Sequence, residues 1–95
     1  MIKHIVFFKL QDNSDEHKNK IKSMLMGLKQ KISQLQHIEV GLNFDESDRA
    51  FDLALITDFK SKEDLSIYQA HSSHQEVVSY LKSCQTVSKV VDYEF

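Results

Sequence analysis

The sequence predicts one α+β domain over residues 1–95, built as a four-stranded antiparallel sheet with helices on one face. Apolar residues alternate in four stretches, as in strands, and recur at three- and four-residue steps between them, as in helices. The order strand–helix–strand–strand–helix–helix–strand is the split βαβ pattern of a ferredoxin-like subunit with its second helix divided in two. The 95 residues suffice for one core, and without proline and with only two glycines no flexible linker divides them.

The first strand is predicted over residues 2–10, and both of its faces are apolar near their centres. One face carries Ile2, His4, Val6, Phe8 and Leu10, and the other carries Lys3, Ile5, Phe7 and Lys9. A strand with one solvated face alternates apolar and polar residues, so this strand is expected to be covered on both sides. The strand predicted over residues 51–59 has the same double-faced pattern.

A helix is predicted from Asp15 to Ser33, with Ser14 as its N-cap. Its apolar stripe consists of Ile21, Met24, Leu25, Leu28, Ile32 and Leu35. A half-buried strand over residues 37–44 follows. The acidic loop 45–49 lacks the spacing and the central glycine of an EF-hand, so a solvated hairpin loop is favoured over a metal site.

Two capping boxes divide the second helical region. The first box starts at Ser61 and opens a helix that ends near Ala70. The second starts at Ser73 and begins a helix that runs toward Cys84. A last strand over residues 86–95 completes the sheet.

Helices on one side of this sheet leave its other side bare. That side is apolar at the centres of two strands, and an exposed patch of this kind usually marks an interface. The sequence therefore predicts a homodimer in which two sheets close face to face into an α/β barrel.

Charge and cysteine content exclude several classes of protein. The net charge of −2 gives no broad attraction to nucleic acid or to anionic lipid, and the lysines of the first helix are not interleaved with base-stacking aromatic residues. No apolar run is long enough for a membrane span or a signal peptide. The single cysteine, Cys84, excludes an internal disulfide and favours a reducing, cytoplasmic setting; with no histidine near it in the sequence, it is expected to be a buried thiol.

The chemistry is expected where the two short helices meet. Tyr68 can donate a hydrogen bond to a developing oxyanion, and a neutral His74 can act as a base. His4 lies on an apolar strand face and needs a polar partner, which Tyr68 or His74 could supply. His71 is expected to serve the turn beside this pocket, whose other lining residues are expected to be Val6, Phe8, Met24, Leu25 and Leu28. The alternative is structural: a satisfied buried histidine and a core tyrosine.

Four segments resemble the stress-responsive dimeric α/β-barrel (Dabb) family. They are Met1–Val6, Phe51–Leu55, Tyr68–Gln75 and Val90–Tyr93, in the family's order and spacing. The resemblance implies a homodimer of ferredoxin-like subunits. A plant branch of the family closes linear polyketides by aldol condensation, and its tyrosine and histidine match Tyr68 and His74, with a pocket histidine matching His4. The resemblance also implies that Leu53 lines the pocket. The sequence departs from that branch at Leu53, where the branch has another pocket histidine, and from most members at Ser72, where they have proline.

The sequence thus predicts a homodimer with a pocket for a small apolar or aromatic ligand, with no cofactor and no metal. Aldol chemistry like that of the polyketide cyclases is one interpretation. The alternatives are a non-catalytic stress or structural dimer and, by analogy of fold alone, a monooxygenase-like enzyme.

Overall fold

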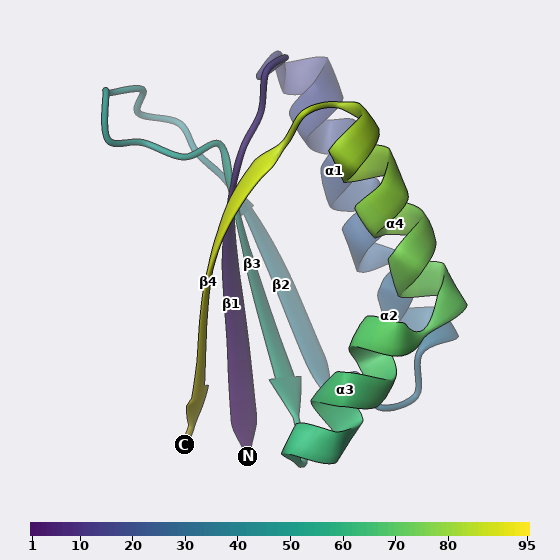
Figure 1. Cartoon of the computed structure of the whole chain (residues 1–95). Helices are drawn as coiled ribbons and strands as arrows, with labels where there is room; N and C mark the ends of the chain where they lie inside the picture. Colours follow the sequence, from purple (N-terminus) through teal and green to yellow (C-terminus); the bar gives the residue numbers. More distant parts are fainter.

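The computed structural model describes all residues from 1 to 95 and has the predicted ferredoxin-like architecture. Its elements are β1 (Ile2–Lys9), α1 (Asp15–Met26), α2 (Leu28–Lys31), β2 (His37–Leu42), β3 (Leu53–Phe59), α3 (Lys62–Ala70), α4 (Ser72–Ser83) and β4 (Val87–Glu94). The sheet has the order β2-β3-β1-β4, and all neighbouring strands are antiparallel. All four helices lie on one side of the sheet (Figure 1). None of them is both long and apolar enough to cross a membrane.

The long first helix that the sequence predicts is divided at Gly27. The helix α1 ends at Met26, and the short helix α2 ends at Lys31, after which Ile32 is extended. Glycine weakens a helix because it adds backbone freedom and no side-chain packing. Leu28, at the start of α2, and Ile32, at its C-cap, are both almost fully buried.

Helix caps account for the other helix starts. Ser14 Oγ accepts a hydrogen bond from the His17 main-chain N–H, and Ser61 Oγ accepts one from Asp64, as predicted. The predicted capping role of Ser73 is wrong. The cap of α4 is His71, whose Nδ1 accepts from the Ser73 N–H at 3.0 Å, so the helix begins at Ser72.

The strands β2 and β3 are each two residues shorter than predicted, and Asp52, just before β3, is bonded to the end of β1. The Asp52 carboxylate accepts a hydrogen bond from the Leu10 N–H at 2.6 Å, and the Asp52 N–H donates to the Phe8 carbonyl. The connection between β2 and β3 projects away from the sheet (Figure 1), and Phe44 within it is 96% exposed.

The hydrophobic core lies between the sheet and the helices. From β1 it takes the predicted face, on which Ile2, Val6 and Phe8 are buried. From the helices it takes Ile21, Leu25, Leu28, Leu65, Tyr68, Val77 and Leu81.

The opposite face of the sheet is not covered within this chain. Phe7 at its centre is 46% exposed, and Val91 on the neighbouring strand is 59% exposed. Strand β4 is exposed along its whole length, on both faces. The predicted double-faced character of the sheet is therefore present, and one apolar face is open to solvent.

Candidate ligand-binding site

Three ring side chains from three elements meet beneath the helices. Tyr68 lies in the last turn of α3, His74 in the first turn of α4 and His4 near the start of β1. The centroids of the Tyr68 and His74 rings are 4.5 Å apart with an interplanar angle of 79°, and those of Tyr68 and His4 are 6.4 Å apart. Tyr68 also stacks on Phe59, which fixes the plane of its ring.

The imidazole of His74 is held in one tautomer. Its Nδ1 lies 3.1 Å from the main-chain carbonyl oxygen of Gln69, which can only accept, so Nδ1 carries the proton and the lone pair is on Nε2. Burial lowers the pKa of His74, and the nearby His4 and His71 lower it further, against the opposing effect of the hydrogen bond to Gln69. His74 is therefore neutral at pH 7, in the state that a base requires.

The hydroxyl of Tyr68 has no hydrogen-bond partner in the chain, although the side chain is 0% exposed. Burial raises the pKa of Tyr68 to about 12, so the hydroxyl keeps its proton. Leaving a buried donor unpaired is unfavourable by roughly 1–3 kcal/mol. Such a group is uncommon in folded proteins and often marks a functional position.

His4 is paired with a residue that the sequence did not suggest. Its Nδ1 is bound to a carboxylate oxygen of Asp92. The sequence had offered Tyr68 or His74 as the partner instead. The two residues face each other across the antiparallel pair of β1 and β4. An acidic residue on the last strand was visible in the sequence, but only the register of that pair brings it to His4. The carboxylate accepts a hydrogen bond from Nδ1–H. The other ring nitrogen, Nε2, lies on the opposite side of the ring and takes no part in this contact.

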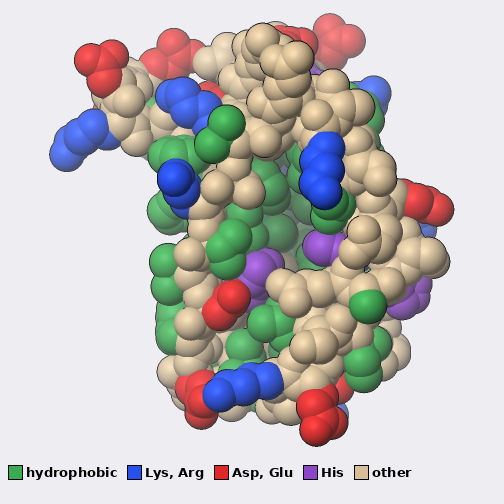
Figure 2. Space-filling view, in the orientation of Figure 1, with side chains coloured by type: hydrophobic (Ala, Val, Ile, Leu, Met, Phe, Trp, Pro, Cys, Tyr) green, Lys and Arg blue, Asp and Glu red, His purple; other side chains and the backbone are tan.

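Five of the predicted residues and several others line a cavity of about 200 Å³ between the sheet and the helices. Tyr68 is not a lining residue: it is fully buried behind His4 and His74, which do line the cavity. Of the predicted residues, His4, His74, Val6, Phe8 and Leu25 line it. The remaining lining residues are Leu55, Gln69, Val77, Val78, Leu81, Ser88 and Val90. Figure 2 shows the hollow, with apolar side chains in its depth and histidine side chains on both sides.

Four of the expected lining residues lie elsewhere. Leu28 is buried in the core, Met24 is partly buried against it, and His71 caps α4. Leu53 pairs with Phe8 and Leu42 at the start of β3, and Leu55 takes its place at the cavity. Leu53 was expected at the pocket because the cyclase branch has a pocket histidine at its position. Alternation gives the face of a strand but not how far along that face a helix sits.

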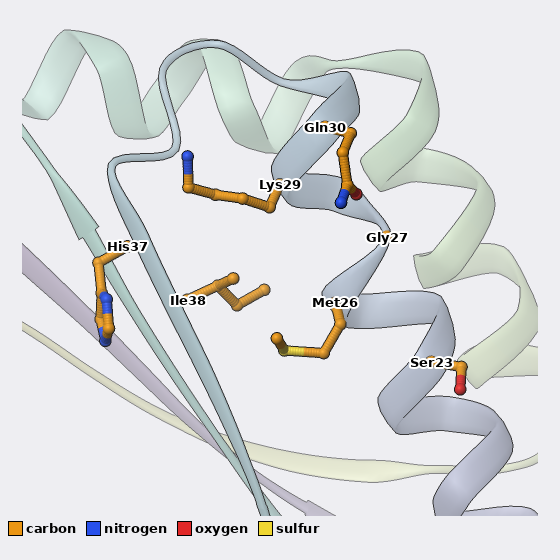
Figure 3. Close-up of a pocket in the computed structure, with 7 residues that line it drawn as sticks. All are labelled: Ser23, Met26, Gly27, Lys29, Gln30, His37 and Ile38. Atoms are coloured by element: carbon orange, nitrogen blue, oxygen red, sulfur yellow. The ribbon is translucent and has the colours of Figure 1, made fainter.

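A larger groove of about 500 Å³ lies at the turn between α1 and α2 (Figure 3). Met26 and Ile38 point toward each other across it, whereas Ser23 and Gln30 point away. Most of its lining residues are exposed, and none of them belongs to the Tyr68 cluster. No group of three or more His, Cys, Asp or Glu residues is placed to hold a metal ion.

Cys84 differs from the buried, isolated thiol that the sequence predicts. It is half-buried, and its Sγ lies 3.9 Å from Nε2 of His17. The two residues are 67 positions apart, so the neighbourhood of Cys84 in the sequence could not show this contact.

The fold and the cavity define a ferredoxin-like domain with one open sheet face and a pocket beneath its helices. The chain belongs to the stress-responsive A/B barrel domain (Dabb) family, whose profile matches residues 2–95. The resemblance seen in the sequence is thereby confirmed.

Curated relatives are similar to this chain in sequence, and solved structures share its fold. The chain is 38% identical over 95 residues to a stress-response A/B barrel domain-containing protein of Arabidopsis thaliana. It is 36% identical to a dimeric ferredoxin-like protein of Bacteroides fragilis, with a TM-score of 0.83, 99% of this chain and 95% of that chain being covered. A hydroxynitrile lyase of Passiflora edulis has a TM-score of 0.80 at 20% identity, covering 97% of this chain and 90% of that chain, which shows a common fold alone.

The curated relatives are longer than this chain. The match to the first Arabidopsis protein covers 95% of this chain but 35% of that protein. The match to a second Arabidopsis protein of the same class covers 98% of this chain but 46% of that protein. The chain thus spans less than half the length of these relatives.

Proposed function

We propose that the cavity binds a small, largely apolar carbonyl compound and that His74 removes a proton from the carbon next to the carbonyl group. The observation that carries this proposal is the buried Tyr68 hydroxyl, which has no partner in the chain and lies beside a neutral imidazole. A ligand carbonyl oxygen is the kind of group that satisfies such a donor. The apolar lining suits an alkyl or aryl remainder.

In the proposed reaction Nε2 of His74 takes the proton, and the electron pair of the broken C–H bond forms an enolate. The Tyr68 hydroxyl donates a hydrogen bond to the enolate oxygen as its charge develops. The Asp92 carboxylate holds His4 on the other side of Tyr68, where the imidazole completes the polar part of the pocket. An enolate that attacks a second carbonyl of the same molecule closes a ring, which is the aldol condensation suggested by the resemblance to the polyketide cyclases.

The proposal is tested by exchange of ketone α-protons for solvent deuterium. Acetophenone and benzylacetone are incubated with the protein in D₂O at neutral pH, and loss of the α-proton signals is followed by NMR. The Tyr68→Phe variant should lower the exchange rate by about 100-fold, since it removes one oxyanion donor. His37→Ala is the matched control, because His37 is an exposed histidine outside the cavity. Equal rates in Tyr68→Phe and the wild type would exclude the proposed donor.

Binding without turnover is the second candidate function, and the size of the cavity favours it. The volume of about 200 Å³ lies below the roughly 300–1,000 Å³ of most ligand pockets. Leu53, where the cyclase branch has a histidine, is also buried at the start of β3 rather than at the cavity. This candidate predicts saturable ketone binding without any exchange of α-protons.

We further propose that two copies of the chain form a homodimer through the open face of the sheet. Phe7, Val91 and Tyr93 expose apolar surface there, and similar solved structures are described as dimeric. A reducing, cytoplasmic setting is part of the same proposal, because the single cysteine leaves no internal disulfide.

A further inference from the structure

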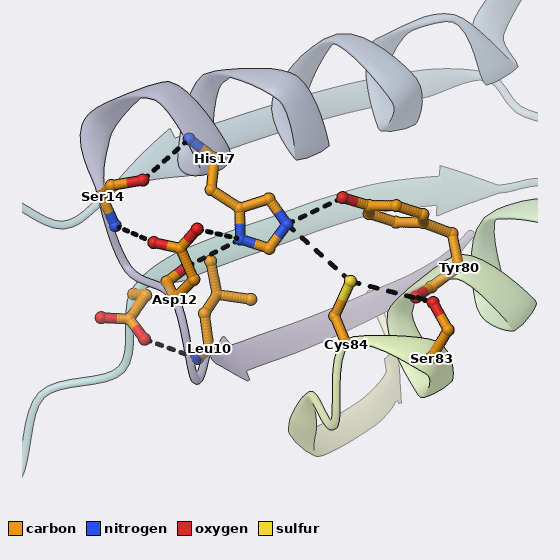
Figure 4. A network of polar contacts seen from close by, with 8 residues as sticks. Leu10, Asp12, Ser14, His17, Tyr80, Ser83 and Cys84 are labelled. Carbon is orange, nitrogen blue, oxygen red and sulfur yellow. Dashed lines mark hydrogen bonds and ion pairs between the residues drawn. The ribbon is translucent and has the colours of Figure 1, made fainter.

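A second polar cluster lies at the other end of α4 from His74. Cys84 follows the last turn of this helix, and Tyr80 lies one turn earlier. Both side chains point toward the imidazole of His17, which comes from α1 (Figure 4). The Tyr80 hydroxyl is 2.9 Å and the Cys84 Sγ is 3.9 Å from the same atom, Nε2 of His17. The cluster shares no residue with the cavity.

The main chain fixes the tautomer of His17. Its Nδ1 is 2.7 Å from the main-chain carbonyl oxygen of Asp12, and a carbonyl can only accept, so Nδ1 carries the proton. In the neutral ring the lone pair is therefore on Nε2, the atom that faces the thiol. A base oriented by a third group in this way is the arrangement that activates nucleophiles.

The carboxylate of Asp12 supports a positive charge on this ring. Its Oδ2 lies 3.8 Å from Nδ1 of His17. Hydrogen bonds from the main chain and side chain of Ser14 lower the pKa of Asp12, so the carboxylate is ionised at neutral pH. A proton that moves from sulfur to Nε2 thus forms an imidazolium that already has a negative neighbour.

Cys84 is reachable and needs such a base. Its side chain is half-buried, and its neighbours Ser83 and Gln85 are exposed. The thiolate, not the thiol, is the nucleophile, so the sulfur must lose its proton as it reacts. His17 Nε2, 3.9 Å away, is the base within reach of it.

We propose that Cys84 is a covalent modification site for α,β-unsaturated carbonyl compounds, with His17 as its general base. Nε2 takes the thiol proton while Sγ forms a bond to the β-carbon, and the electron pair of the C=C bond moves toward the carbonyl to give an enolate. The imidazolium then returns the proton to the α-carbon. Nothing leaves and no oxidant is needed. Conjugate addition suits this cluster because it needs a proton donor after the bond forms, whereas simple displacement does not.

The probe for this site is N-ethylmaleimide, and the readout is the second-order rate of its addition at neutral pH, measured by intact mass. Cys84 is the single cysteine, so one mass increment reports one site, and Cys84→Ser should show none. The wild type should react faster than N-acetylcysteine. His17→Asn should be at least about tenfold slower, a conservative share of what a positioned base contributes. His37→Asn, at an exposed histidine, is the matched control and should react like the wild type.

His17→Asn keeps the main-chain N–H that Ser14 caps, so α1 should remain intact, which circular dichroism checks. Tyr80→Phe provides a second variant. It removes the hydroxyl that shares Nε2 with the thiol and should raise the rate. The proposal is overturned if His17→Asn reacts as fast as the wild type, if the wild type is no faster than N-acetylcysteine, or if Tyr80→Phe gives no increase.

Discussion

Burial keeps both Tyr68 and His74 uncharged near pH 7, although it moves their pKa values in opposite directions. It raises the pKa of the tyrosine to about 12 and lowers that of the histidine, because in each case the charged form loses hydration. Both groups are therefore neutral near pH 7. A neutral acid beside a neutral base is the starting state for removing a proton next to a carbonyl group.

The lowered pKa of His74 predicts that stability falls in mild acid. Below the unfolded pKa of about 6.5 the unfolded chain binds a proton at this position more readily than the folded chain does, so the free energy of unfolding decreases as the pH falls. Melting temperatures are compared between about pH 7.5 and about pH 5.5, on either side of that value. The drop should be smaller in His74→Asn than in the wild type. An equal drop in both proteins would show that His74 is not the group responsible.

Residue types and faces were predictable at this scale, but long-range partners were not. The alternation of β1 places His4 on the core face, and the helical period places Tyr68 there. The Asp92 partner of His4 depends on the register between β1 and β4, and the His17 partner of Cys84 depends on the packing of α1 near the end of α4. Neither of these partners can be predicted from the spacing of residues that are close in the sequence.

The start of α4 brings Tyr68 and His74 together. His71 is extended and its imidazole caps the new helix, so the chain turns between α3 and α4 within one residue. Two polar groups then bind the carbonyl of Gln69, one from His74 and one from Gln75, and hold the two helices at this angle. The sequence predicted the break, but it assigned the cap to Ser73 because Ser73, with Glu76 three residues later, has the form of a capping box.

Removing the His71 cap should weaken the chain by about 1 kcal/mol. We expect His71→Ala to lower the free energy of unfolding in urea by this amount, while His71→Asn, whose side-chain oxygen can also accept from the helix N–H groups, should stay near the wild type. The same loss in both variants would mean that packing of the imidazole, not capping, is the important contribution.

For the whole molecule, the sheet has one face in the core and one face open, with an exposed edge strand. The double-faced apolar pattern of β1 predicted this from the sequence alone, because no helix was left to cover the second face. What the pattern could not fix is the position of the helices along the sheet, which is why Leu55 rather than Leu53 borders the cavity.

The proposed homodimer predicts that a charge at the centre of the open face separates the subunits. Phe7→Glu places a carboxylate in the apolar patch and should give a monomer by light scattering at micromolar concentration, where the wild type is a dimer. Ile67→Glu is the matched control, since Ile67 is equally exposed but lies on α3. A Phe7→Glu dimer would place the interface elsewhere.

The most direct test of the central claim is the rate at which His74→Ala exchanges the methyl protons of acetophenone for deuterium. If His74 is the base, this variant should fold normally and exchange about 100-fold more slowly than the wild type, the lower end of what a positioned base contributes. Exchange in folded His74→Ala at the wild-type rate would contradict the account.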